Sequence, residues 1–219
     1  MTLVRRATNL LFIAAAAGAV VGMSAAPALA ATTLTVKVSN GGTYTATASK
    51  TVLSDNGVNV SCTSTSTTAA SKGSGTVATA THTGTSPVKV GTVSKLAFNH
   101  CSGPLGAVHV TVNALPYSIK VDSATTSTGK TDGIITGASV HVTMTGCSFN
   151  VTGSAPGFYT NGTHKLSVTK SLPTTPLNSA QLTVSSVSGC AGLVNNGDHP
   201  SYTSTYTVSR HFTIKSTKS

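Results

Sequence analysis

The sequence predicts an all-β protein, an antiparallel immunoglobulin-like β-sandwich held by two disulfides. Three observations support this prediction. Short segments alternate apolar and polar residues with a period of two, and clusters of Gly, Asn, Asp and Ser separate them. Long straight-chain residues, which fill helical surfaces, are scarce, and glutamate does not occur. Four cysteines are spread widely along a chain whose start resembles an export signal.

Residues 1–30 are predicted to be a cleaved signal peptide. Arg5 and Arg6 form a short positive region, and an apolar run over residues 10–23 follows. The run ends before Ala28-Leu29-Ala30, which has the small-x-small pattern of a signal-peptidase site. The apolar run is too short for a transmembrane anchor. We therefore expect residues 31–219 to form a secreted β-sandwich domain with no membrane span.

Each predicted strand has one apolar face. The segments with the clearest alternation bury, in chain order, Leu34, Val36 and Val38; Val58, Val60 and Cys62; Val108, Val110 and Val112; Ala138, Val140, Val142 and Met144; and Tyr202, Tyr206, Val208, Phe212 and Ile214. Residues 63–75 and 123–133 are rich in Ser, Thr and Gly without apolar periodicity, and they are predicted to be long loops.

Four cysteines permit three pairings in an exported chain. We favour Cys62–Cys101 and Cys147–Cys190, because these pairs close loops of similar size. A metal site is the alternative, but no C-x-x-C spacing occurs. The favoured pairing also fits a weak internal repeat over residues 31–107 and 108–219. In each half a strand leads into a cysteine, and a second strand with a cysteine is followed by a glycine-containing turn.

The net charge of +10 counts 14 basic and 4 acidic residues. The basic residues after the leader form no run, whereas a nucleic-acid-binding protein normally concentrates them in a patch. We therefore expect no nucleic-acid partner. Association with anionic cell-wall polymers fits this dispersed charge better.

The segment from Ser188 to Tyr202 is the candidate functional loop, with Asn195, Asn196, Asp198 and His199 as its notable residues. Adjacent Asp and His side chains rarely orient one another as in a catalytic triad, and no G-x-S-x-G motif occurs. Glycoside hydrolysis needs two carboxyl groups at a set separation, and the chain has only four aspartates and no glutamate. We accordingly expect turn chemistry in this loop and no catalytic residues.

Histidines and aromatic residues give two further expectations. Seven histidines are scattered without a metal-binding spacing, so neither a metal nor another cofactor is expected. The chain has no tryptophan, which counts against a sugar-binding platform. Four tyrosines are candidates to line an apolar cavity between sheets: Tyr117, Tyr159, Tyr202 and Tyr206.

The segments "GCSFNVTGSAPGFYTNGTHKL" and "VSGCAGLVNNGD", with the Ala-rich leader, resemble small secreted β-rich proteins of actinobacteria whose function is uncharacterised. This resemblance implies export and a β-rich fold, and it supplies no active site. In its four-cysteine plan the chain is also similar to the neocarzinostatin-like carrier proteins, which are immunoglobulin-like sandwiches. It departs from them in its greater length, basic charge and wider cysteine spacing.

Together these features predict a non-enzymatic exported protein that acts as a structural or binding module at the cell envelope or outside the cell. The first alternative is a carrier of a small apolar ligand held between sheets. The second is a secreted hydrolase.

Overall fold

Alternating segments become strands throughout the computed structural model, which describes residues 32–170, 172 and 181–219. The predicted signal peptide lies outside the described residues. The described part contains no helix, and so none that is long and apolar enough to cross a membrane. Its strands are β1 (Thr33–Ser39), β2 (Gly42–Ala48), β3 (Lys50–Asp55), β4 (Val58–Thr63), β5 (Ser71–Val77), β6 (Thr81–Thr85), β7 (Val88–Phe98), β8 (Cys101–Gly103), β9 (Gly106–Val112), β10 (Tyr117–Val121), β11 (Lys130–Met144), β12 (Cys147–Thr160), β13 (Lys165–Val168), β14 (Leu182–Ser188), β15 (Ser201–Val208) and β16 (Thr213–Lys218).

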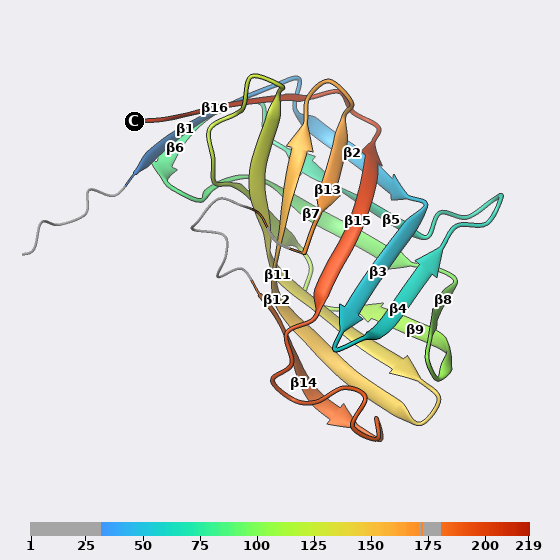
Figure 1. The fold of residues 1–219 in the computed structure, drawn as a ribbon. Helices are drawn as coiled ribbons and strands as arrows, with labels where there is room; N and C mark the ends of the chain where they lie inside the picture. The colour runs from blue at the N-terminus through green and yellow to red at the C-terminus, as the bar shows by residue number, and fades with distance from the viewer. Residues whose placement is uncertain (1–31, 171, 173–180) are drawn as a thin grey trace, which may run out of the picture. The chain divides into compact units, whose positions relative to one another are not determined.

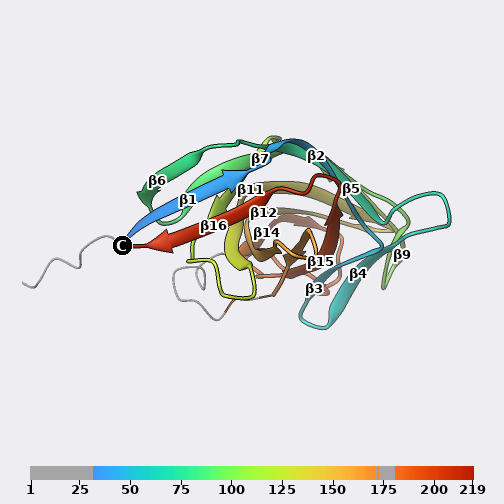
Figure 2. The same ribbon diagram turned by 90° about the horizontal axis from the view of Figure 1, so that it is seen from above.

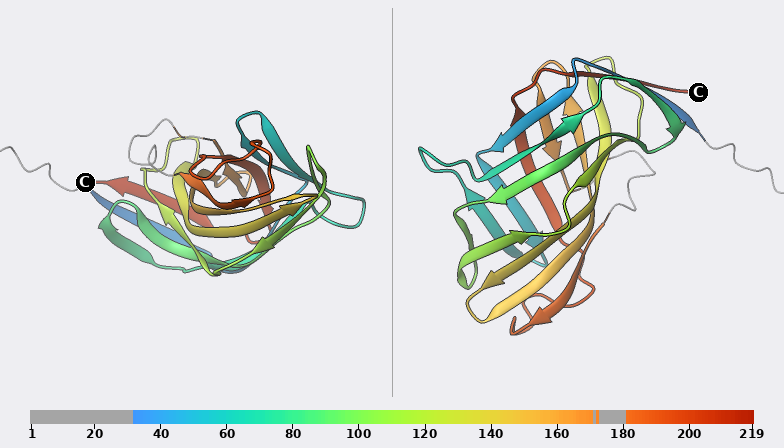
Figure 3. Two further views of the ribbon diagram at one scale, coloured as in Figure 1. Left: turned by 90° about the horizontal axis from the view of Figure 1, so that it is seen from below. Right: turned by 180° about the vertical axis from the view of Figure 1, so that it is seen from behind.

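All strand pairings are antiparallel and form two sheets, one of three strands and one of thirteen (Figure 1). The small sheet has the order β16-β1-β6. The large sheet runs from β14 through β12, β13, β15, β2, β5, β7, β10, β11, β9, β8 and β4 to β3. Additional pairings join β12 to β11 and β15 to β3, so the large sheet folds back on itself. Strands β5 and β7 consequently face β13 and β15 across an interior (Figures 1 and 3).

Two large apolar core clusters fill most of the interior, beside a small one at Ile134 and Leu172. The first joins the small sheet to the large one and includes Leu34, Val36 and Ile214. The second lies around β11, β12 and β14 and includes Val142, Phe149 and Val184. Figure 2 shows β1 and β16 lying beside β7 and β11, where the first cluster forms. The predicted inward faces of residues 34–38 and 138–144 are thus confirmed, since Leu34, Val38, Val142 and Met144 are buried.

The predicted fold class and both disulfides are confirmed. The protein is all-β, its two antiparallel sheets are arranged like a sandwich, and the bonds are Cys62–Cys101 and Cys147–Cys190. The first bond joins residues that face one another on the neighbouring strands β4 and β8. Two disulfides are compatible with an oxidising, extracellular environment.

Two expectations about local structure differ from the fold. The predicted common face over residues 202–214 divides, because β15 lies in the large sheet and β16 in the small one. The predicted loop over residues 63–75 ends early, since β5 begins at Ser71. Gly75 in this strand is needed for close packing, because a Cβ there would lie 1.9 Å from the carbonyl oxygen of Thr92. Its glycines therefore mark a close strand contact and no loop.

The second predicted loop also ends early, because β11 begins at Lys130 within residues 123–133. The proposed repeat over residues 31–107 and 108–219 stays a prediction. Its boundary falls inside β9.

Candidate functional site

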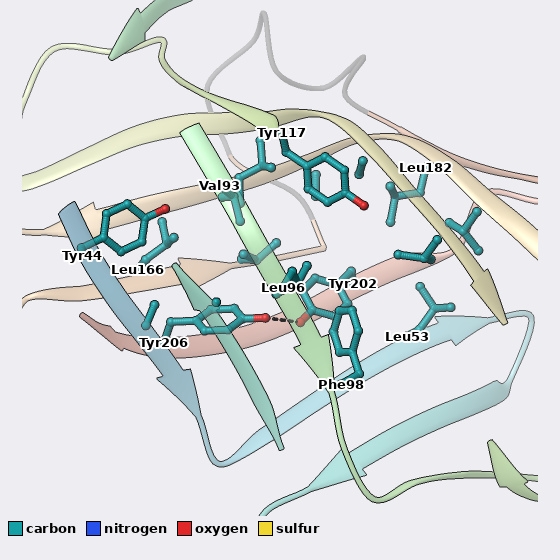
Figure 4. A pocket seen from close by; sticks show the side chains of 18 residues that line it. Tyr44, Leu53, Val93, Leu96, Phe98, Tyr117, Leu166, Leu182, Tyr202 and Tyr206 are labelled. Carbon is teal, nitrogen blue, oxygen red and sulfur yellow. Dashed lines mark hydrogen bonds between the residues drawn. The ribbon is translucent and has the colours of Figure 1, made fainter. Parts of the chain in front are cut away.

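An apolar cavity of about 110 Å³ lies inside the large sheet, between the two core clusters (Figure 4). Its wall comes from strands on both sides of the interior. The lining residues are Tyr44, Ala46, Leu53, Gly73, Val93, Leu96, Phe98, Tyr117, Ile135, Ala138, Val140, Val151, Ala155, Leu166, Val168, Leu182, Tyr202 and Tyr206.

The cavity exists because small residues occupy several inward positions. Ala46, Gly73, Ala138 and Ala155 line it where larger residues would fill the space. A bulge in β11 between Thr136 and Ala138 shifts the register against β12. After that shift Ala138 and Val140 face inward, in line with the period-two alternation of a strand.

The tyrosines present rings to the cavity while their hydroxyls bond to the protein. The hydroxyls of Tyr202 and Tyr206 lie 2.6 Å apart, and Tyr206 also bonds to the hydroxyl of Ser71 at 3.0 Å. Tyr44 donates to the carbonyl oxygen of Thr92 at 3.2 Å. Tyr117 donates to the carbonyl oxygens of residues 113 and 139. The polar atoms of these four side chains are therefore already satisfied.

Burial also keeps the tyrosine hydroxyls neutral. It raises the pKa of Tyr206, and it raises the pKa of Tyr202 well above its ordinary value, with a further increase from the neighbouring Tyr206. Burial likewise raises the pKa of Tyr44. The wall of the cavity thus carries no charge at physiological pH.

Three smaller apolar cavities adjoin the main one and share its side chains. Two of about 30 Å³ share Leu166 with the main cavity. One of about 40 Å³ shares Leu53, Phe98 and Tyr202 with it. The interior is therefore loosely filled along a path from the first cluster to the second.

A polar cleft of about 180 Å³ adjoins the main cavity on the side of β12 and β15. Ala155, Leu182 and Tyr202 line both spaces. The other residues of the cleft are Ser154, Pro156, Thr169, Lys170, Gln181, His199, Pro200 and Ser201. An apolar interior and a polar surface cleft thus share part of their wall.

The candidate loop predicted from the sequence lies beside this cleft. The backbone N–H of Asn195 donates to Asp198 Oδ2 at 2.7 Å, and the N–H of Val187 donates to Asn196 Oδ1 at 3.1 Å. Gly197 has a φ of 89°, and its N–H donates to the carbonyl oxygen of Val184 at 2.9 Å. These bonds fold the loop back onto β14, so the expected turn chemistry is present.

His199 is the residue of the predicted loop that lines the cleft. Its Nδ1 lies 3.1 Å from the carbonyl oxygen of Leu182, which can only accept a hydrogen bond. The Nδ1 therefore carries the proton, and this bond fixes the ring at the edge of the cleft. The Nε2 of the same ring has no bond within the described residues.

Asp55, at the end of β3, interacts with Asp198 across a long sequence separation. Burial raises the pKa of Asp55 to about 6, and the charge of Asp198 and a hydrogen bond between the two carboxyl groups add to the increase. His199 opposes this shift through its charge. In the sequence Asp55 precedes Asn56 and Gly57, a pattern that indicates only a turn. Only the pairing of β3 with β15 brings it to the loop.

Replacing Asp55 with asparagine should make the folded protein less sensitive to pH. Asp55 binds its proton more tightly in the folded chain, with a pKa of about 6, than at its ordinary value of 3.8. Its contribution to stability is therefore fully present below pH 4 and is lost as the pH rises through 6. Water near the surface screens part of this effect, so we expect Asp55→Asn to be more stable than the parent by about 1–2 kcal/mol at pH 8.

Urea denaturation of Asp55→Asn and the parent at pH 4 and pH 8 measures this effect. The advantage of the variant should be small at pH 4 and appear at pH 8. An advantage of the same size at both values would show that the fold does not raise the pKa of Asp55.

Three other histidines form contacts away from the cleft. His141 Nδ1 lies 2.7 Å from Asn150 Oδ1 on the paired strand, and the ring of His164 stacks on His211 at 3.9 Å. In the part of the chain that the structure describes, no group of three His, Cys, Asp or Glu side chains is arranged to hold a metal ion. Of the four predicted cavity tyrosines, Tyr117, Tyr202 and Tyr206 line the main cavity. Tyr159 lies outside it and stacks on Phe212.

Comparison with known proteins identifies no relative. No family model, no curated protein and no solved structure gives a significant match to this chain.

Proposed function

We propose that this is an exported, non-enzymatic binding protein that carries a small apolar ligand in its interior cavity. The observation that supports it is the uncharged cavity of about 110 Å³, whose polar side-chain atoms are already bonded. Apolar cavities of about 150 Å³ stay dry and bind molecules such as benzene. The predicted signal peptide and the two disulfides support a location outside the cell.

The cavity favours a carrier over a purely structural module at the envelope. Protein interiors are close-packed, and an unfilled cavity costs about 24 cal/mol per Å³. For 110 Å³ the cost is about 2–3 kcal/mol, a large share of the stability of a domain. A structural module has no use for such a space, whereas a bound ligand offsets its cost. Association with anionic wall polymers remains a separate prediction, based on the dispersed lysines.

Filling the cavity should abolish binding. Ala138 lines the cavity, and leucine at this position would occupy part of its volume. We expect toluene, a probe of suitable size, to bind the parent saturably and to bind Ala138→Leu at least about tenfold more weakly. Titration followed by protein NMR measures the dissociation constants.

The matched control is Ala97→Leu, the same substitution at an exposed position of β7 that does not line the cavity. It should bind toluene like the parent. The proposal is wrong if toluene does not bind the parent saturably, or if Ala138→Leu folds and binds it unchanged.

A further inference from the structure

The polar cleft and the apolar cavity are neighbouring spaces that share part of their wall. Ala155 of β12, Leu182 of β14 and Tyr202 of β15 line both spaces. Tyr202 is partly exposed, and its side chain borders both spaces. A ligand in the cavity would therefore extend past these side chains into the cleft.

The cleft favours a negative charge. Its lining includes Lys170, His199 and the neutral Tyr202 but no Asp or Glu. The Nδ1 of His199 is bonded to Leu182, and this bond leaves Nε2 for a ligand. The carboxyl groups that interact with this region are those of Asp55 and Asp198. They are engaged with each other, and Asp198 also accepts from the backbone of Asn195.

We propose that the ligand is a small anionic amphiphile, whose apolar body fills the cavity while its carboxylate lies in the cleft near Lys170 and His199. This inference rests on the proposed function and specifies the ligand class. A cavity of about 110 Å³ limits the buried body to about the size of one ring or a chain of six to eight carbons. The lysine ammonium attracts the carboxylate as a point charge, and the Nε2 of His199 lies on a ring that lines the same cleft.

The head group is tested with three probes of equal chain length: octanoate, 1-octanol and octylammonium. Calorimetric titration at pH 6 and low salt should show octanoate binding at least about tenfold more tightly than octylammonium. Lys170→Gln should weaken octanoate about three- to tenfold and leave 1-octanol unchanged, because Lys170 is exposed and solvent screens its charge. The double variant Lys170→Gln/His199→Gln should weaken octanoate further.

Lys72→Gln is the matched control, since Lys72 is an exposed residue of β5 that lines neither space. It should bind octanoate like the parent. If the three probes bind equally and the double variant keeps its affinity for octanoate, the anionic head group is wrong while the apolar carrier stands. If toluene and all three probes fail to bind the parent, the carrier function itself is wrong.

Discussion

Replacing Cys147 and Cys190 with alanine should lower the free energy of unfolding by about 4 kcal/mol. The two residues are 43 positions apart, and a crosslink that closes a loop of this length removes about that much chain entropy from the unfolded state. Both residues are also buried within the second core cluster, so alanine adds a small packing loss. Urea denaturation of the variant and the parent measures the difference.

The same disulfide should also hold the candidate loop in place. Cys190 lies near the start of the segment between β14 and β15, which also carries Asp198 and His199. The disulfide ties this segment to Cys147, the first residue of β12. We therefore expect the amides of Val194 and Gly197 to exchange faster with solvent in the variant.

The control is Cys62→Ala/Cys101→Ala. These cysteines are 39 positions apart, so a similar loss of about 4 kcal/mol is expected. They join two strands that are already paired, and neither cysteine lies in β12, β14 or the candidate loop. Exchange in the candidate loop should therefore stay close to that of the parent. Equal acceleration in both variants would show that the Cys147–Cys190 bond does not specifically anchor the loop.

Local patterns in the sequence predicted the features of the fold that depend on near neighbours. Alternation identified the buried faces of residues 34–38 and 138–144, because side chains on one strand point to opposite faces. The large sheet folds back on itself through the pairings β12–β11 and β15–β3. The β15–β3 pairing joins residues about 150 positions apart, and no local pattern encodes it. The glycines of β5 were wrongly predicted to lie in a loop, because glycine is common both in loops and at close contacts between strands.

The candidate site was likewise predictable only where it depends on local sequence. Turn-forming residues marked the loop that carries His199, and amphipathic tyrosines indicated a cavity. The cavity itself depends on small residues, such as Ala138 and Ala155, that meet only after folding. An alanine in a strand gives no signal of whether a neighbour fills the space beside it. The interaction of Asp55 with Asp198 likewise required the tertiary fold.

Replacing Phe212 with alanine should lower the free energy of unfolding by about 3–5 kcal/mol. Phe212 is only 5% exposed, and its ring stacks on Tyr159 with centroids 4.5 Å apart and meets Tyr44 edge-on at 6.3 Å. It precedes β16, so its ring packs the small sheet against the large one. Removing the ring would enlarge the cavity of about 30 Å³ that it borders and would remove both aromatic contacts. Thermal and urea denaturation measure the loss.

The informative comparison is Phe98→Ala, because Phe98 is partly exposed and its ring borders the space that is already empty. Truncation there enlarges an existing cavity and removes fewer contacts, so we expect a loss of about 1–2 kcal/mol. The enlarged cavity should bind a longer apolar probe, such as decanoate, more tightly than the parent does. If Phe98→Ala instead destabilises the protein as much as Phe212→Ala and binds decanoate no better, the interior is not a preformed ligand cavity. The difference between these two phenylalanines thus separates a space kept for a ligand from an ordinary packing defect.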